Sequence, residues 1–225
     1  MQEGHSQIPD WFEAIDVKIV SNELVDVLKS FCVATGAWEF KNLLYGHFHR
    51  DSNGGLLPEF FQHNLSDFPA RYREFVFRLP QDCELEEPKI VPQRELFEAL
   101  IEKYSIGEHT VILMPYAYSM GLLSDAFWEE AADLLTDMGY TVYTNVKDDS
   151  EFPIAGTTAI CADIATMAAL CERCRMVIAL RSGICDVLYF TETRLITING
   201  QDLISQWNAE KSNRKRHIYN FQVKE

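Results

Sequence analysis

The stretch that decides the fold is VILMPYAYSMGLLSDAFWEEAADLLTDMGYTVYTNV, residues 111–146. It begins within the apolar run Thr110–Met114, which is typical of a strand buried on both faces. Ser124 is a suitable N-cap for a helix through Asp137. The apolar positions of that helix are 127, 131, 134, 135 and 138. Gly139 ends the helix and Tyr140–Thr144 predicts the next strand, so the stretch is one strand–helix–strand unit.

The same alternation is found on both sides of this unit. Upstream, Arg94–Tyr104 predicts a helix; downstream, Ile164–Cys174 and Ile184–Thr191 predict two more. Met176–Leu180 and Leu195–Ile198 predict strands. Strands that alternate with helices of about ten residues imply right-handed crossovers and a parallel sheet. We therefore expect the segments 110–114, 140–144, 176–180 and 195–198 to form one parallel, Rossmann-like α/β sheet.

The segment QDCELEEPKIVPQ, residues 81–93, is acidic and rich in proline, which is typical of a linker. The residues before it show less regular patterns, with a predicted strand at 42–47. They are too few for a complete second Rossmann domain, which needs about 120–150 residues. We expect a truncated α/β region at 1–85 and a Rossmann-like domain at 86–225.

The composition is that of a globular protein and excludes several classes. With 47% hydrophobic and 24% charged residues in 225, the chain is neither a disordered tail nor a disulfide miniprotein. Lys and Arg number 20 against 34 Asp and Glu, which gives a net charge of −14. Binding to nucleic acid depends on cationic contacts with phosphates, so we expect no nucleic-acid partner.

The sequence predicts a cytoplasmic protein with reduced thiols. It contains no apolar run of transmembrane length, and its first 16 residues do not have the pattern of a secretory signal. The six cysteines lie mostly in apolar runs. Cys171 and Cys174 form a C-x-x-C at a helix end, where packing is favoured over redox chemistry. Zinc-finger spacing is absent, so no metal site is expected there.

Two loops are candidate binding sites, because open parallel sheets bind ligands beyond the carboxyl ends of their strands. One is residues 115–124, after the strand at 110–114, and the other is RSGICD, Arg181–Asp186. In the second, amides at Ser182 and Gly183 and the guanidinium of Arg181 suit a phosphate. The structural alternative is that Ser182 caps, Gly183 turns and Asp186 stabilises the helix. In that alternative, Arg181 pairs with Asp186 or a neighbouring carboxylate. The sequence contains neither G-x-G-x-x-G nor G-x-x-x-x-G-K-[ST], so neither a dinucleotide dehydrogenase nor a P-loop enzyme is supported.

Residues 111–146, followed by VIALRSGICDVL at 177–188, resemble bacterial polysaccharide-biosynthesis proteins of the glycosyltransferase B fold. RSGICD is also similar to the donor-binding loop of heptosyltransferases and nodulation-type fucosyltransferases. The resemblance covers residues 110–198 well and the N-terminal part loosely, through IVSNELVDVLKSF and NLLYGHFH.

The resemblance implies a nucleotide-diphospho-sugar donor and transfer of the sugar to a glycan or lipid-linked acceptor. Arg181 would stabilise the leaving diphosphate, and such folds usually need no metal. The residues implied around the donor are Ser119, Asn145, Arg181, Ser182, Gly183 and Asp186. Most of an N-terminal acceptor domain is missing from the pattern, so a non-catalytic nucleotide-binding or assembly module is the alternative.

Two further features carry weaker hypotheses. His47 and His49 lie in HFHRD, residues 47–51, where a metal-dependent hydrolase would need further ligands that the sequence does not supply. His47 is a candidate general base for an acceptor hydroxyl. The basic run Lys211–His217 is a candidate docking point for an anionic lipid-linked acceptor, peripheral to the inner membrane. A homo-oligomer is left open.

Overall fold

The structure is a computed structural model that describes residues 8–12, 20–21, 23–24, 27, 79–80, 82–83, 87–117, 123–199 and 218–222. The chain divides into two compact units, Met1–Glu87 with Ser205–Ser212, and Pro88–Ile204 with Asn213–Glu225. In the first unit the described part includes a short 3-10 helix, Ile8–Trp11. The second unit contains the sheet and its helices. The expected α/β pattern of residues 1–85, including the strand at 42–47, lies mostly outside the described residues.

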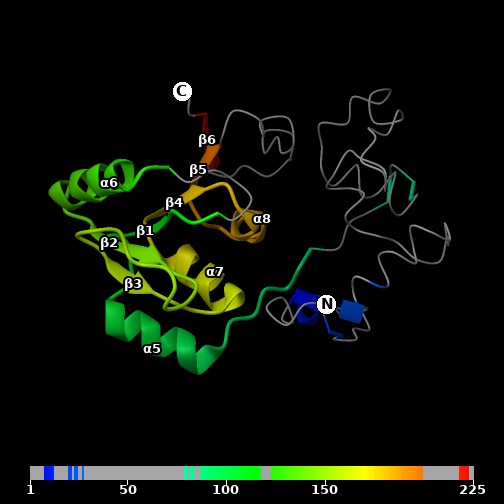
Figure 1. The fold of residues 1–225 in the computed structure, drawn as a ribbon. Helices are drawn as coiled ribbons and strands as arrows, with labels where there is room; N and C mark the ends of the chain where they lie inside the picture. Colours follow the sequence, from blue (N-terminus) through cyan, green and yellow to red (C-terminus); the bar gives the residue numbers. More distant parts are fainter. Residues whose placement is uncertain are drawn as a thin grey trace. The chain divides into compact units, whose positions relative to one another are not determined.

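The sheet has six strands in the order β3-β2-β1-β4-β5-β6, and every neighbouring pair is parallel (Figure 1). The strands are β1 Thr110–Met114, β2 Thr141–Asn145, β3 Thr158–Ile160, β4 Met176–Leu180, β5 Leu195–Asn199 and β6 Ile218–Gln222. This is the strand order of a doubly wound Rossmann sheet. The four strands predicted from sequence are confirmed as parallel, while β3 and β6 are additional.

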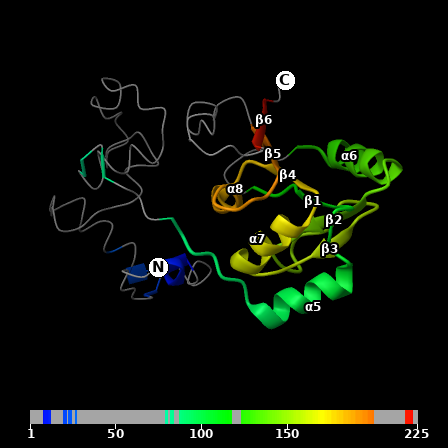
Figure 2. The ribbon, with the colours of Figure 1, turned by 180° about the vertical axis from the view of Figure 1, so that it is seen from behind.

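Helices cover both faces of the sheet, as Figures 1 and 2 show from opposite sides. They are α5 Arg94–Tyr104, α6 Asp125–Asp137, α7 Ile164–Arg173 and α8 Gly183–Leu188. The β1–α6–β2 connection crosses the sheet in one direction and β3–α7–β4 in the other. Right-handed crossovers therefore place α6 on one face and α7 on the opposite face.

Two apolar cores result, one on each face of the sheet. All five residues of β1 are buried, and alternate side chains enter alternate cores. Val111 and Leu113 pack with Trp128 of α6, whereas Ile112 and Met114 pack with residues of α5, α7 and α8. A strand buried on both faces is mostly apolar, which explains the run VILM, and the hydroxyl of the buried Thr110 accepts a hydrogen bond from the Gly107 amide.

The ends of α6 follow from the predicted local signals. The Ser124 hydroxyl accepts a hydrogen bond from the Phe127 amide at 3.3 Å, so Ser124 is the N-cap. Gly139 has φ of 88°, and its amide donates to the Thr136 carbonyl. The left-handed conformation that ends the helix favours glycine at this position.

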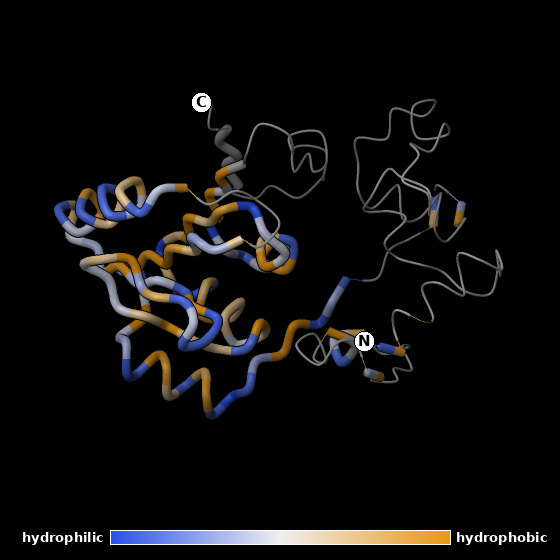
Figure 3. Tube along the Cα trace, viewed as in Figure 1, coloured by the Kyte–Doolittle hydropathy of each residue, from blue (hydrophilic) through white to orange (hydrophobic). Residues whose placement is uncertain are grey.

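The predicted apolar face of α6 is only partly right, because Leu135 is buried as predicted but three other predicted positions are exposed. Phe127, Leu134 and Met138 are 41%, 58% and 69% exposed, while the buried residues are Trp128, Ala132 and Leu135. The helix carries two adjacent apolar stripes, and the one containing Trp128 faces the sheet. Figure 3 shows hydrophilic and hydrophobic residues alternating along this helix.

The C-x-x-C residues have the packing role predicted for them. Cys171 and Cys174 are buried, free thiols at the end of α7. Burial raises the pKa of Cys174 to about 12, the opposite of what a redox thiolate needs. Among the described helices, none is long and apolar enough to cross a membrane.

Candidate functional site

The candidate site lies where β1 and β4 meet at the carboxyl edge of the sheet. These strands are neighbours, with Met114 paired to Ala179, although two other strands separate them in sequence. After β1 the chain moves toward β2, and after β4 it moves toward β5, so the two loops leave in opposite directions. In open α/β sheets, ligands bind in a crevice at such a switch in strand order, which makes the region between the two loops the candidate crevice. The two loops predicted from sequence are therefore brought to adjacent strand ends.

The loop after β4 is a tight turn directly into α8. The Arg181 amide donates to the Ile198 carbonyl of β5 at 2.9 Å, so Arg181 is still held by the sheet. Ser182 is extended, with φ of −150°, and Gly183 begins the helix. Among the described residues, the Ser182 side chain makes no capping hydrogen bond to the helix amides. The side-chain capping role considered for Ser182 is thus absent. The Cys185 amide donates to the Ser182 carbonyl at 3.0 Å, whereas the two amides before it, at the start of an α-helix, have no acceptor within the helix.

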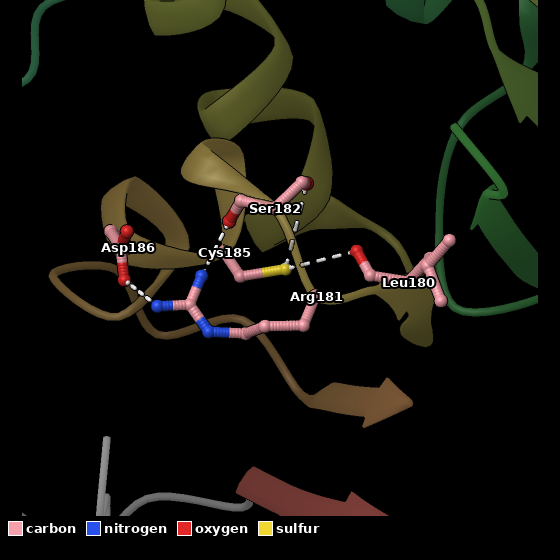
Figure 4. Close-up of polar contacts among 5 residues, drawn as sticks. All are labelled: Leu180, Arg181, Ser182, Cys185 and Asp186. Atoms are coloured by element: carbon pink, nitrogen blue, oxygen red, sulfur yellow. Dashed lines mark hydrogen bonds and ion pairs between the residues drawn. The ribbon is translucent and has the colours of Figure 1, made fainter. Parts of the chain in front are cut away.

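The Arg181 guanidinium is held on two sides (Figure 4). Its Nη1 donates to the Ser182 carbonyl at 2.6 Å, and its Nη2 lies 2.5 Å from Oδ1 of Asp186. The Arg181 side chain is 20% exposed and that of Asp186 is 41% exposed. The sequence left two alternatives for Arg181, a solvent-facing loop charge or a partner of Asp186, and the structure shows the pair with Asp186. The pair fixes the guanidinium at the end of β4.

The buried side chain of Cys185 packs against the turn, a contact that was not predicted from the sequence. Its Sγ lies 3.7 Å from the Leu180 carbonyl oxygen and 4.0 Å from the Ser182 hydroxyl (Figure 4). The side chain is buried, and burial raises the pKa of the thiol, so it stays neutral near pH 7. A small, neutral and partly polar side chain fits beneath the turn without adding charge to it.

Gly183 is not required by the fold. A Cβ at this position would have no atom within 4 Å apart from its immediate neighbours, so the space beside it is open. Its φ does not lie in the left-handed region, unlike those of Gly139 and Gly156. The turn can be made by residues with side chains, and the glycine instead leaves the α8 amides uncovered.

Asn145 lies at the same edge of the sheet but on the far side of β1. Thr144 pairs with Leu113 and Ala179 pairs with Met114, so Asn145 is level with Ala179. Two strand spacings separate β2 from β4, about 10 Å. Asn145 is therefore near the crevice without touching the Arg181 turn. Ser119 and His47 lie outside the described residues.

A contact between the β1 and β2 loops was also missed from the sequence. The Tyr116 hydroxyl, two residues beyond β1, donates a hydrogen bond to the Phe152 carbonyl in the β2–β3 connection. Burial raises the pKa of Tyr116, and the carboxylates of Glu151 and Asp125 raise it further, so the hydroxyl keeps its proton. Alternation and motif patterns do not reveal such a contact, because it joins two irregular loops. In the part of the chain that the structure describes, no group of three metal-ligating side chains comes together.

No family model and no curated protein matches the sequence. Two solved structures of the heptosyltransferase WaaC from E. coli are similar to this chain, one with ADP and one with ADP-2-deoxy-2-fluoro heptose. Both have a TM-score of 0.54 and cover 99% of this chain and 82% of the solved chain, at 14% and 11% identity. The likeness at this identity concerns the fold, which is that of a GT-B glycosyltransferase. The fold expected from the sequence resemblance is confirmed.

Proposed function

We propose that this protein binds a nucleotide-diphospho-sugar in the crevice between the β1 and β4 loops and acts as a glycosyltransferase. The observation that carries the proposal is the Arg181 guanidinium, fixed at the end of β4 beside uncovered amides at the switch in strand order. A planar cation and backbone N–H groups are the donors that a diphosphate requires. The structures of similar fold contain ADP and an ADP-sugar analogue, which supports the same ligand class here.

The proposed reaction is a displacement at the anomeric carbon of the sugar. An acceptor hydroxyl oxygen forms the new bond to that carbon, the bond to the diphosphate oxygen breaks, and the hydroxyl proton passes to a base. Arg181 and the amides of Ser182 and Gly183 offset the charge that develops on the leaving diphosphate. His47 is the candidate base. Ser119 and Asn145 are proposed as further donor contacts, and Asp186 as the residue that orients Arg181.

The wider role proposed is the assembly of a bacterial cell-surface polysaccharide from a cytoplasmic donor. The acceptor is a glycan or a lipid-linked glycan.

A thermal-shift panel identifies the ligand. UDP, GDP, ADP, CMP and their sugars are added separately at increasing concentration. A ligand that binds only the folded state at 100 times its Kd stabilises it by about 2.7 kcal/mol, which is readily measured. Stabilisation by one nucleotide diphosphate and its sugar is expected, with little effect of the other bases.

Arg181→Ala is the decisive variant, titrated with the responsive nucleotide by calorimetry. Loss of a charge-assisted contact of about 1.5–3 kcal/mol predicts a 10- to 150-fold weaker affinity. Arg181→Lys should recover part of the loss, because an ammonium cannot make the paired contact. Because the Arg181–Asp186 pair is partly exposed, we expect a stability cost of at most about 1 kcal/mol.

Arg175→Ala is the matched control. Arg175 precedes the same strand at its amino edge and pairs with Glu108 at 3.5 Å. Its loss removes another ion-paired arginine beside the same strand without touching the candidate crevice, so the affinity should not change. Equal affinities in wild type and Arg181→Ala, or equal losses in both variants, would contradict the proposed donor site.

A further inference from the structure

The connection between β2 and β3 presents one aromatic ring at the carboxyl edge of the sheet. Residues 146–157 join these strands without a helix, and they leave β2 beside the loop that follows β1. Within this connection, Phe152 is 74% exposed, the highest exposure among the large hydrophobic residues that the structure describes. Most exposed hydrophobic side chains need no explanation, but this one stands beside the candidate crevice.

The backbone that carries this ring is held from both sides. The Ile154 amide donates to the Thr144 hydroxyl of β2 at 3.2 Å, and the Ile154 side chain is buried in the core beneath. On the other side, the Tyr116 hydroxyl donates to the Phe152 carbonyl. Pro153 restricts the backbone between these anchors. The backbone that carries the exposed ring is therefore held in place, so binding of a ligand to the ring costs little backbone conformational entropy.

The charges around the crevice differ between its two sides. On the β2 side, Asp148, Asp149 and Glu151 precede Phe152, with Lys147 as the one cation of that run. Hydrogen bonds from Ser150 lower the pKa of Asp148, so this carboxylate is ionised. On the β4 side lies the Arg181 guanidinium. A phosphate is disfavoured near the carboxylates and favoured near Arg181, whereas a neutral aromatic base tolerates the acidic side.

We propose that Phe152 is the stacking platform for the base of the bound nucleotide, with the diphosphate at the Arg181 turn. This inference rests on the function proposed above. Because β1 lies between β2 and β4, a ligand held by both the β2–β3 connection and the Arg181 turn must extend across β1. A nucleoside diphosphate has this form, with its base and its phosphates on opposite sides of the ribose. Stacking on a single ring accepts every base, so Phe152 supplies affinity and leaves the choice of base to polar groups.

The test compares two probes on the intact chain, the responsive nucleoside diphosphate and inorganic pyrophosphate. Base–aromatic stacking predicts that Phe152→Ala binds the nucleoside diphosphate about 5- to 150-fold more weakly. Affinity for pyrophosphate should not change, because pyrophosphate has no base. Phe152→Trp should retain the affinity. The melting temperature of Phe152→Ala should stay close to that of wild type, because the ring is 74% exposed.

Two control variants make the outcomes separable. Phe190→Ala removes another exposed phenylalanine, 36% exposed and located after α8 toward the amino edge of the sheet, and should change neither affinity. Arg181→Ala should weaken the binding of both probes.

If wild type binds neither probe, the proposed function fails, and the inference with it. If Arg181→Ala weakens both probes while Phe152→Ala binds the nucleoside diphosphate as wild type does, only the stacking role is overturned. Equal weakening of both probes by Phe152→Ala would also overturn it.

Discussion

Arg181 and Gly183 occupy adjacent parts of one turn but are constrained differently. Arg181 is fixed by the Asp186 carboxylate and the Ser182 carbonyl, so its removal changes both the fold and the proposed ligand contact. A Cβ added at Gly183 would have no atom within 4 Å apart from its immediate neighbours, and the φ of Gly183 lies outside the left-handed region. A substitution at Gly183 therefore tests ligand binding with the least effect on folding.

Gly183→Ala should fold at least as well as wild type and bind the nucleotide diphosphate at least about tenfold more weakly. Alanine has a better helix propensity than glycine by up to about 1 kcal/mol, and less in the first turn. The added methyl group would occupy the open space beside the α8 amides, where the phosphate is proposed to lie. Urea unfolding measures the first effect and calorimetric titration measures the second. Unchanged affinity would show that the ligand does not approach these amides.

At the scale of elements, helix boundaries could be predicted from sequence more reliably than helix faces. Ser124 and Gly139 mark the start and end of α6 through their own chemistry, so both ends were predicted to within a residue or two. Its buried face was predicted only in part, at Leu135, because hydrophobic spacing alone does not distinguish two adjacent apolar stripes. β3 was missed because it has only three residues, too few for a clear strand pattern. The predicted helix at 184–191 begins one residue earlier, at Gly183, and ends at Leu188.

Leu134 and Leu135 of α6 provide a matched pair for this correction. Leu135 is 8% exposed and packs in the core with Trp128, whereas Leu134 is 58% exposed. Leu135→Ala should lower the free energy of unfolding by about 2–5 kcal/mol, because it leaves a cavity. Leu134→Ala should change it by less than about 0.5 kcal/mol. Denaturant unfolding of the two variants measures the difference. A larger loss of stability in Leu134→Ala than in Leu135→Ala would contradict the buried face that the structure shows.

At the scale of the whole molecule, the sequence predicted a parallel sheet but not the order of its strands. The apolar runs at β1 and β4 look alike, and their being neighbours depends on backbone pairing across more than 60 residues of intervening chain. The two candidate loops could nevertheless be predicted, because the carboxyl ends of parallel strands always meet at one edge. The Tyr116–Phe152 contact was not predicted, since it depends on the paths of two loops. Pairing of Arg181 with Asp186 was predicted only as the structural alternative to phosphate binding, and the structure contains that pair. The resemblance in sequence and the likeness in structure agree on the fold alone.

The central claim is that a nucleoside diphosphate binds between the β1 and β4 loops. Amide chemical-shift mapping of the labelled protein during titration with the responsive nucleotide tests it most directly. We expect saturable shifts at Ser182, Gly183 and Asn145, at the carboxyl edge of the sheet. The amides of Gly107 and Gly139, in turns at the amino edge, should stay in place. Shifts confined to the amino edge, or no shifts at a nucleotide concentration that stabilises the protein, would contradict the claim.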